Sequence, residues 1–175
     1  MGCECDCKTE TSKAPALREV KLEFLYLDEA ACEPCGEAAQ TVETDAEVAR
    51  GPFAAMGVVL NIEKKHITGC EVANNERLLT SPTICVGGVD IDPAVTEDNC
   101  PSCGTLARDD AKVDCRVWHW RGEVFPAAPV GRIVESLMAA AIMPAPAPTE
   151  AGEFTLPKNL KRVFAAKEKG ATLGC

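Results

Sequence analysis

The stretch that decides the fold is Val20-Lys-Leu-Glu-Phe-Leu-Tyr-Leu-Asp-Glu-Ala-Ala-Cys-Glu-Pro-Cys35. Its first half, residues 20–27, has the apolar and aromatic pattern of a β-strand. The chain that follows the two cysteines, from Gly36 to about Ala55, has the pattern of a helix. Cys32 is therefore expected at a helix N-terminus, where unpaired N–H groups and the helix dipole stabilise a thiolate. We expect Cys32 to attack disulfides and Cys35 to resolve the mixed disulfide.

Apolar periodicity and turn residues predict the rest of the domain. The predicted elements are a strand over 58–64, a short helix over 71–79, a strand over 83–86, a turn at Gly87-Gly88, a return strand over 89–91, a hairpin of 115–120 with 123–125 closed at Arg121-Gly122, and a helix over 130–142. Gly51-Pro52 is expected to end or kink the first helix. Pro93 opens a loop-like insertion between the two hairpins.

Three segments are predicted along the chain. Residues 1–17 are a polar, cysteine-bearing tail, residues 18–143 form the main domain, and residues 144–175 form a Pro/Ala linker and a short amphipathic helix. That last helix carries an apolar stripe, which consists of Leu156, Leu160, Val163 and Phe164.

Composition excludes several classes of function. A chain of 175 residues with 46% hydrophobic content can bury a core, and a formal charge of −9 disfavours nucleic acid or an anionic membrane as the main partner. The N-terminus lacks the apolar stretch of a secretory signal, and the longest apolar run, 137–143, is too short to span a bilayer. We expect a cytoplasmic protein.

Eleven cysteines in a reducing compartment indicate redox or metal chemistry. Cys100-Pro-Ser-Cys103 has the spacing of a zinc knuckle, and Cys115 is a candidate third ligand. We expect these three cysteines to form a second thiol site, apart from the first pair. The alternatives are a local disulfide or thiols in a loop.

The N-terminal cysteines form another group. Cys3, Cys5 and Cys7 alternate, so an extended chain presents all three sulfurs on one side, an arrangement that suits Zn, Cu(I) or other thiophilic metals and metalloids. The alternative is a tail without a defined site. We interpret Cys85 as a small core residue and both histidines as structural or exposed.

The order strand–CxxC–helix–strand–helix–Pro–strand–turn–strand–helix resembles the thioredoxin fold over residues 18–143. More narrowly, the chain resembles the DUF2703 family of thioredoxin-like proteins of unknown function, through residues 25–35, Ser81-Pro-Thr-Ile84, Asn99-Cys-Pro-Ser-Cys-Gly104 and Asp114-Cys-Arg-Val-Trp118. The resemblance implies an α/β fold with a central mixed sheet flanked by helices, a cysteine-containing insertion, and an extra hairpin before the last helix. It also implies a cis Ser81–Pro82 bond beside Cys32, with Pro82 shaping the partner-binding face.

Two departures argue against a general reductase. Thioredoxins carry a buried acid six residues before the first cysteine and a tryptophan directly before it, where this chain has Tyr26 and Ala31. We therefore expect a specialised thiol–disulfide redox protein that needs no cofactor and acts on a protein disulfide or thiol partner. The alternative is a cysteine-based protein that binds or traffics zinc or another thiophilic metal or metalloid without turnover, loaded by a metal donor.

Overall fold

Strand β1 (Arg18–Tyr26) lies at the centre of the fold, between a parallel and an antiparallel neighbour. A computed structural model describes residues 17–27, 33–99, 114–143 and 152–168 of the chain. The other elements are α1 (Glu33–Ala55), β2 (Val58–His66), α2 (Cys70–Asn75), β3 (Thr83–Val86), β4 (Val89–Asp90), β5 (Thr96–Asn99), β6 (Asp114–Trp120), β7 (Glu123–Phe125), α4 (Val130–Ile142) and α5 (Lys158–Glu168).

The strands form two sheets. The first has the order β2-β1-β3-β4, with β1 parallel to β2, and with β3 antiparallel to both β1 and β4. The second has the order β5-β6-β7 and is antiparallel throughout. The fold is thus mixed α/β, with a mixed sheet flanked by helices, as the sequence predicts.

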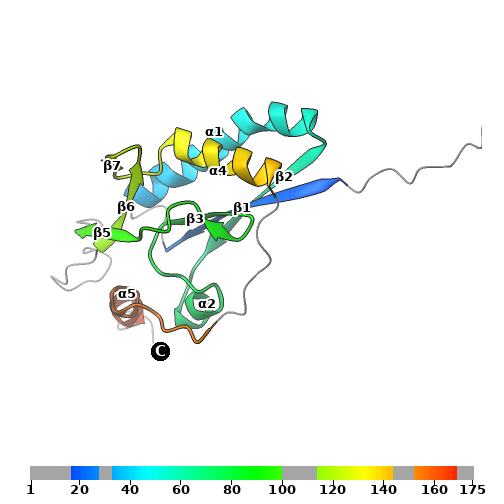
Figure 1. Cartoon of the computed structure of the whole chain (residues 1–175). Coiled ribbons are helices and arrows are strands. Elements are labelled where there is room, and N and C mark those ends of the chain that lie inside the picture. Colours follow the sequence, from blue (N-terminus) through cyan, green and yellow to red (C-terminus); the bar gives the residue numbers. More distant parts are fainter. Residues whose placement is uncertain (1–16, 28–32, 100–113, 144–151, 169–175) are drawn as a thin grey trace, which may run out of the picture.

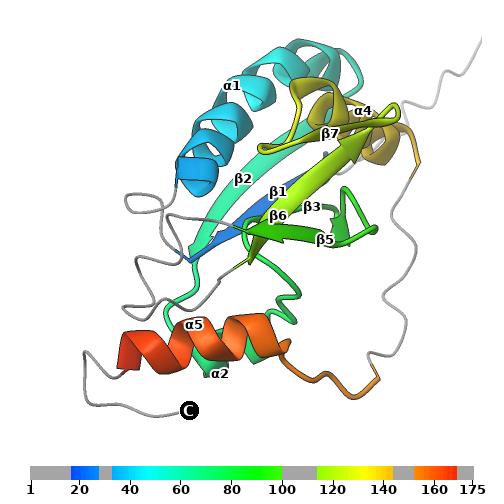
Figure 2. The ribbon, with the colours of Figure 1, turned by 90° about the vertical axis from the view of Figure 1, so that its left-hand side faces the viewer.

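Helices α1 and α4 lie against one face of the four-stranded sheet, and α2 and α5 lie on the other side, near the ends of β1 and β2 (Figure 1 and Figure 2). Successive side chains of a strand point to opposite faces, so Val20, Leu22 and Phe24 of β1 pack with α1 and α4. Leu25 and Leu27 belong instead to the second apolar cluster. This cluster, called the thiol cluster below, contains Leu25, Leu27, Cys35, Ile67, Ala73, Leu78, Cys115, Leu156, Leu160, Val163 and Phe164.

The predicted tight turns are present and have the backbone that their residues favour. At the turn between β3 and β4, Gly87 and Gly88 have φ values of 59° and 79°. Between β6 and β7, Arg121 and Gly122 have φ values of 52° and 86°. Positive φ at both central residues matches the right-handed twist of a hairpin, which is why glycine marks such turns in a sequence.

Helix α1 ends at Ala55, as predicted. Of the two effects expected of Gly51-Pro52, a helix end does not occur there, because buried Phe53 anchors the last turn in the core and the carbonyl of Pro52 accepts a hydrogen bond from the Met56 N–H at 3.1 Å. One predicted helix end is wrong. Helix α2 stops at Asn75 rather than 79, because Arg77 adopts a φ of 51° and the Leu78 N–H turns back to the carbonyl of Ala73.

Strand β5 forms inside the segment that the sequence indicates to be a loop. Its residues, Thr96-Glu-Asp-Asn99, are all polar and give no alternating signal, and the strand exists by pairing with β6 from Thr96↔Val117 to Asn99↔Asp114. Asn159 of α5 ties this pair to the C-terminal helix, because its side-chain amide donates to the carbonyl of Asp114 at 2.7 Å and to Glu97 Oε1 at 3.1 Å.

The apolar stripe predicted for the last helix is buried. Leu156, Leu160, Val163 and Phe164 are each at most 3% exposed, and all belong to the thiol cluster. Figure 2 shows α5 lying alongside α2. None of the helices in the described ranges is long and apolar enough to cross a membrane.

Candidate functional site

Cys35 lies in the first turn of α1, directly after the segment that leaves the end of β1. The side chain is 1% exposed and belongs to the thiol cluster. Its Sγ atom lies 3.8 Å from the hydroxyl oxygen of Ser81, which comes from the segment before β3. The position of Cys35 in the first turn of a helix agrees with the sequence analysis. Its partner in the motif, Cys32, lies outside the described residues.

Ser81 connects Cys35 to two other parts of the fold. Its hydroxyl oxygen accepts a hydrogen bond from the Leu27 N–H at 3.2 Å, at the end of β1. Its carbonyl oxygen accepts one from the Arg116 N–H of β6, also at 3.2 Å. Ser81 is 6% exposed, Pro82 is buried, and the Ser81–Pro82 bond is cis, as expected. The sequence analysis identified Pro82 as a site residue but assigned no role to the hydroxyl of the preceding residue, Ser81.

Four described cysteines lie in or against the thiol cluster. Cys35 and Cys115 are buried members, whereas Cys70 and Cys85 are partly buried and pack against it. Cys35, Cys85 and Cys115 are reduced thiols, and Cys70, the first residue of α2, is disulfide-bonded. The disulfide of Cys70 therefore involves none of the other three. Nothing in the sequence around Cys70 marked it as an oxidised residue.

Cys115 lies in the same apolar cluster as Cys35. The reason is the Arg116–Ser81 backbone hydrogen bond, which places the start of β6 beside the segment that contacts Cys35. Cys100 and Cys103 lie outside the described residues. The predicted second thiol site of Cys100, Cys103 and Cys115 stays a prediction.

Cys85 on β3 is a poor nucleophile. Burial raises the pKa of its thiol to about 12, and the nearby carboxylates of Asp90 and Glu23 contribute in the same direction. A thiol with such a pKa stays protonated at neutral pH, and the thiolate is the reactive form. This agrees with the interpretation of Cys85 as a small core residue.

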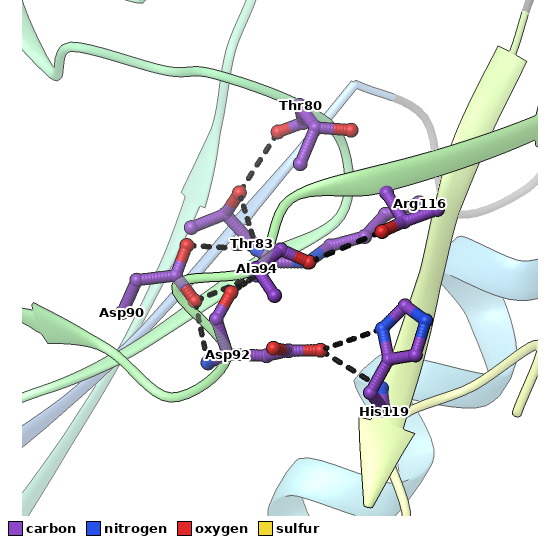
Figure 3. Close-up of polar contacts among 8 residues, drawn as sticks. Thr80, Thr83, Asp90, Asp92, Ala94, Arg116 and His119 are labelled. Atoms are coloured by element: carbon purple, nitrogen blue, oxygen red, sulfur yellow. Dashed lines mark hydrogen bonds and ion pairs between the residues drawn. The ribbon is translucent and has the colours of Figure 1, made fainter. Parts of the chain in front are cut away.

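Arg116 fixes β6 against the β3–β4 hairpin (Figure 3). Its side chain is fully buried and donates two hydrogen bonds, each 2.8 Å long, to the carboxylate of Asp90. It also donates to the carbonyl of Asp92 and to the Thr83 hydroxyl, and its guanidinium lies 4.2 Å from the centre of the Trp118 ring. This cluster of bonds sets the position of β6, and therefore of the neighbouring Cys115.

A second contact of β6 runs through Asp92. Its carboxylate accepts a hydrogen bond from the His119 N–H at 2.8 Å and lies 3.6 Å from His119 Nδ1 (Figure 3). Trp118 is fully buried in the main core. Trp120 is only partly buried, and its indole N–H donates to Glu135 of α4 at 3.1 Å.

Tyr26 stands where thioredoxins have a buried acid. Its ring stacks with those of Phe24 and His66, with ring centres 5.3 Å apart in both pairs. His66 Nε2 lies 2.9 Å from the carbonyl oxygen of Leu27. An aromatic stack therefore occupies this position, and any proton that leaves Cys35 needs an acceptor other than a carboxylate at residue 26.

The metal predictions fall largely on residues that are not described. Cys3, Cys5, Cys7, Cys100 and Cys103 all lie outside the described residues. Within residues 17–27, 33–99, 114–143 and 152–168, no three His, Cys, Asp or Glu side chains converge in a way that could hold a metal ion. Zinc binding by Cys100, Cys103 and Cys115 stays a prediction.

Comparison with known proteins identifies the family. No curated protein and no solved structure matches the chain. The model of one family, described as a domain of unknown function (DUF2703), matches residues 20–137, which include β1, Cys35, Ser81-Pro82 and Cys115. Because this match covers more than half of the 175 residues, the chain belongs to the DUF2703 family.

Proposed function

We propose that the chain is a thioredoxin-like thiol–disulfide redox protein in which Cys32 and Cys35 are the reacting pair. The observation that carries the proposal is the setting of Cys35. It is a buried thiol in the first turn of a helix, it contacts Ser81 next to Pro82, and it shares a cluster with reduced Cys115 and disulfide-bonded Cys70. The sheet order β2-β1-β3-β4, with Pro82 directly before β3, supports a thioredoxin-like fold.

The reaction has two exchange steps. The Cys32 thiolate attacks one sulfur of a substrate disulfide, so that a mixed disulfide forms and the first substrate sulfur leaves as a thiolate. Cys35 then loses its proton and attacks the sulfur of Cys32, which forms the Cys32–Cys35 disulfide and releases the second substrate thiolate. The released thiolates take up protons. Two electrons pass to the substrate, and an external dithiol restores the pair.

The surroundings of Cys35 favour a specialised rather than a general reductase. Tyr26 replaces the acid, and the buried Cys35 belongs to an apolar cluster that also contains side chains of α5. Ionisation of a thiol is unfavourable in such surroundings. We therefore expect slow turnover with generic disulfides and faster exchange with a matched protein partner.

A trapping experiment tests the proposal. Full-length protein with Cys35→Ser, incubated with a disulfide-bonded peptide, should accumulate a mixed disulfide at Cys32 that peptide mass mapping detects. Cys85→Ser is the matched control, because Cys85 is a protonated thiol against the same cluster, and it should turn over like the wild type. The redox assignment would be refuted if the variant forms no adduct at Cys32 and the wild type forms no Cys32–Cys35 disulfide in a redox titration.

The second candidate is metal or metalloid binding without turnover. It is favoured by the density of thiols in the sequence and by the thiol of Cys115, which opens the hairpin after the cysteine-containing insertion. Thiolates are ligands for zinc and other thiophilic metals. Elemental analysis of protein purified without added metal, compared between the wild type and Cys115→Ser, distinguishes this candidate. A stoichiometric metal that is lost in the variant supports it, and equal metal content in the two proteins contradicts it.

A further inference from the structure

The hydroxyl group of Ser81 faces the sulfur of the buried resolving cysteine. Its oxygen lies 3.2 Å from the Leu27 nitrogen and 3.8 Å from Cys35 Sγ. We propose that the Ser81 hydroxyl donates a hydrogen bond to Cys35 Sγ and stabilises the thiolate that Cys35 must form in the second exchange step. Ser81 is then a positioning residue of the reaction, and this inference rests on the proposed redox function.

The direction of the hydrogen bond to a Cys35 thiolate follows from counting donors. A serine hydroxyl has one proton to donate and two lone pairs that accept. The Leu27 N–H can only donate, so it occupies a lone pair of the Ser81 oxygen and leaves the hydroxyl proton available. Among the described residues, Cys35 Sγ lies 3.8 Å from the same hydroxyl oxygen. When Cys35 is a thiolate it has no proton of its own, so the contact then requires Ser81 as the donor.

The need for such a donor follows from burial. Cys35 is 1% exposed among apolar side chains, and a charged group there loses the water that would solvate it. Cys85 shows the direction of this effect, because burial raises the pKa of its thiol to about 12 even with Arg116 and Lys65 acting in the opposite direction. Hydrogen bonds to charged groups are shorter and stronger than neutral ones, so a single hydroxyl offsets part of this cost.

The hydroxyl is held in place before the reaction. Ser81 is bonded to the end of β1 through its side chain and to β6 through its carbonyl oxygen. Arg116, whose N–H makes the second bond, is itself fixed by Asp90. Because the donor is already oriented, little reorganisation is needed when charge develops on the sulfur.

The test measures the ionisation of Cys35 in the reduced, full-length protein. The NMR signal of the Cys35 β-carbon is recorded through a pH titration. A hydrogen bond to a charged group, at about 1.5–3 kcal/mol, corresponds to about 1–2 pH units. Ser81→Ala should therefore move the Cys35 midpoint up by about 1 unit or more, and Ser81→Thr, which keeps the hydroxyl, should restore a midpoint close to the wild type. The Cys85 resonance in the same sample is the internal control and should not move.

Unchanged Cys35 ionisation in folded Ser81→Ala would overturn the inference, and so would a Ser81→Thr midpoint equal to that of Ser81→Ala. If Ser81→Ala does not fold, the wild type provides the second measurement. Its Ser81 hydroxyl proton should show a nuclear Overhauser contact to the Cys35 β-protons, and a proton directed elsewhere contradicts the inference. The titration uses the reduced protein and does not need the Cys32–Cys35 disulfide to form. Failure of the redox proposal would appear in the trapping experiment, and failure of this inference would appear in the titration.

Discussion

Replacing Asp90 by alanine should cost about 3 kcal/mol of folding free energy, because it leaves Arg116 as a buried charge without its carboxylate. The change removes two hydrogen bonds of 2.8 Å from a guanidinium that is 0% exposed. Removal of one partner from a buried ion pair typically costs about 3–5 kcal/mol. The lower end applies here, because the Asp90 side chain is 23% exposed and water can enter where it stood. The remaining contacts, to Thr83 and to the carbonyl of Asp92, carry no full negative charge.

Urea denaturation followed by far-UV circular dichroism measures this cost as a difference in unfolding free energy. Glu123→Ala is the control, because Glu123 is an exposed carboxylate on β7, and it should change stability by no more than about 0.5 kcal/mol. A loss for Asp90→Ala that is no larger than that of the control would refute the view that this ion pair holds β6 to the β3–β4 hairpin. The double variant Asp90→Ala, Arg116→Met should recover part of the loss, since it removes the unpaired charge.

Three further outcomes are expected. Burial raises the pKa of Asp45 to about 6, above its unfolded value of about 3.9, so the free energy of unfolding should fall as pH rises from about 4 to 6. The total fall should be at most about 3 kcal/mol, and Asp45→Asn should remove most of it in denaturation curves taken at each pH. Alkylation of unfolded, unreduced protein followed by peptide mapping should find Cys70 in a disulfide and the other three described cysteines alkylated, and an alkylated Cys70 contradicts the structure. Leu160 is 1% exposed, so Leu160→Ala should lower the free energy of unfolding by about 2–5 kcal/mol. Lys161→Ala, at the exposed neighbouring residue, should have little effect. Equal effects of the two variants would show that α5 is not part of the core.

Local signals in the sequence predicted much of the fold. The Gly87-Gly88 and Arg121-Gly122 turns were predictable, because positive φ values at two successive positions restrict the residue types that fit. The helix after the Cys-x-x-Cys motif and α4 followed from apolar spacing. The cis Ser81–Pro82 bond followed from the family resemblance rather than from the residues themselves.

The failures all involve contacts between distant parts of the chain. Strand β5 has no apolar pattern and depends on β6 for its hydrogen bonds, so single-strand periodicity could not reveal it. Gly51-Pro52 could end or kink the helix on local signals alone, and the helix does not end there because Phe53 reaches the core. At the candidate site, the sequence indicated Cys35 but could not place Cys115 in the same cluster, because the link runs through a backbone hydrogen bond between β6 and Ser81.

Helix α5 has a consequence for how the family domain is defined. The match to the family ends at residue 137, whereas α5 occupies Lys158–Glu168 and supplies three of the buried side chains around Cys35 and Cys115. A fragment trimmed to the family boundary would leave both sulfurs open to dissolved oxygen and to small alkylating reagents. Oxidation measured on such a fragment would report lost shielding rather than the chemistry of the intact protein. For this chain, a piece that keeps the α5 side chains in the cluster of Cys35 and Cys115 extends about thirty residues beyond the family match.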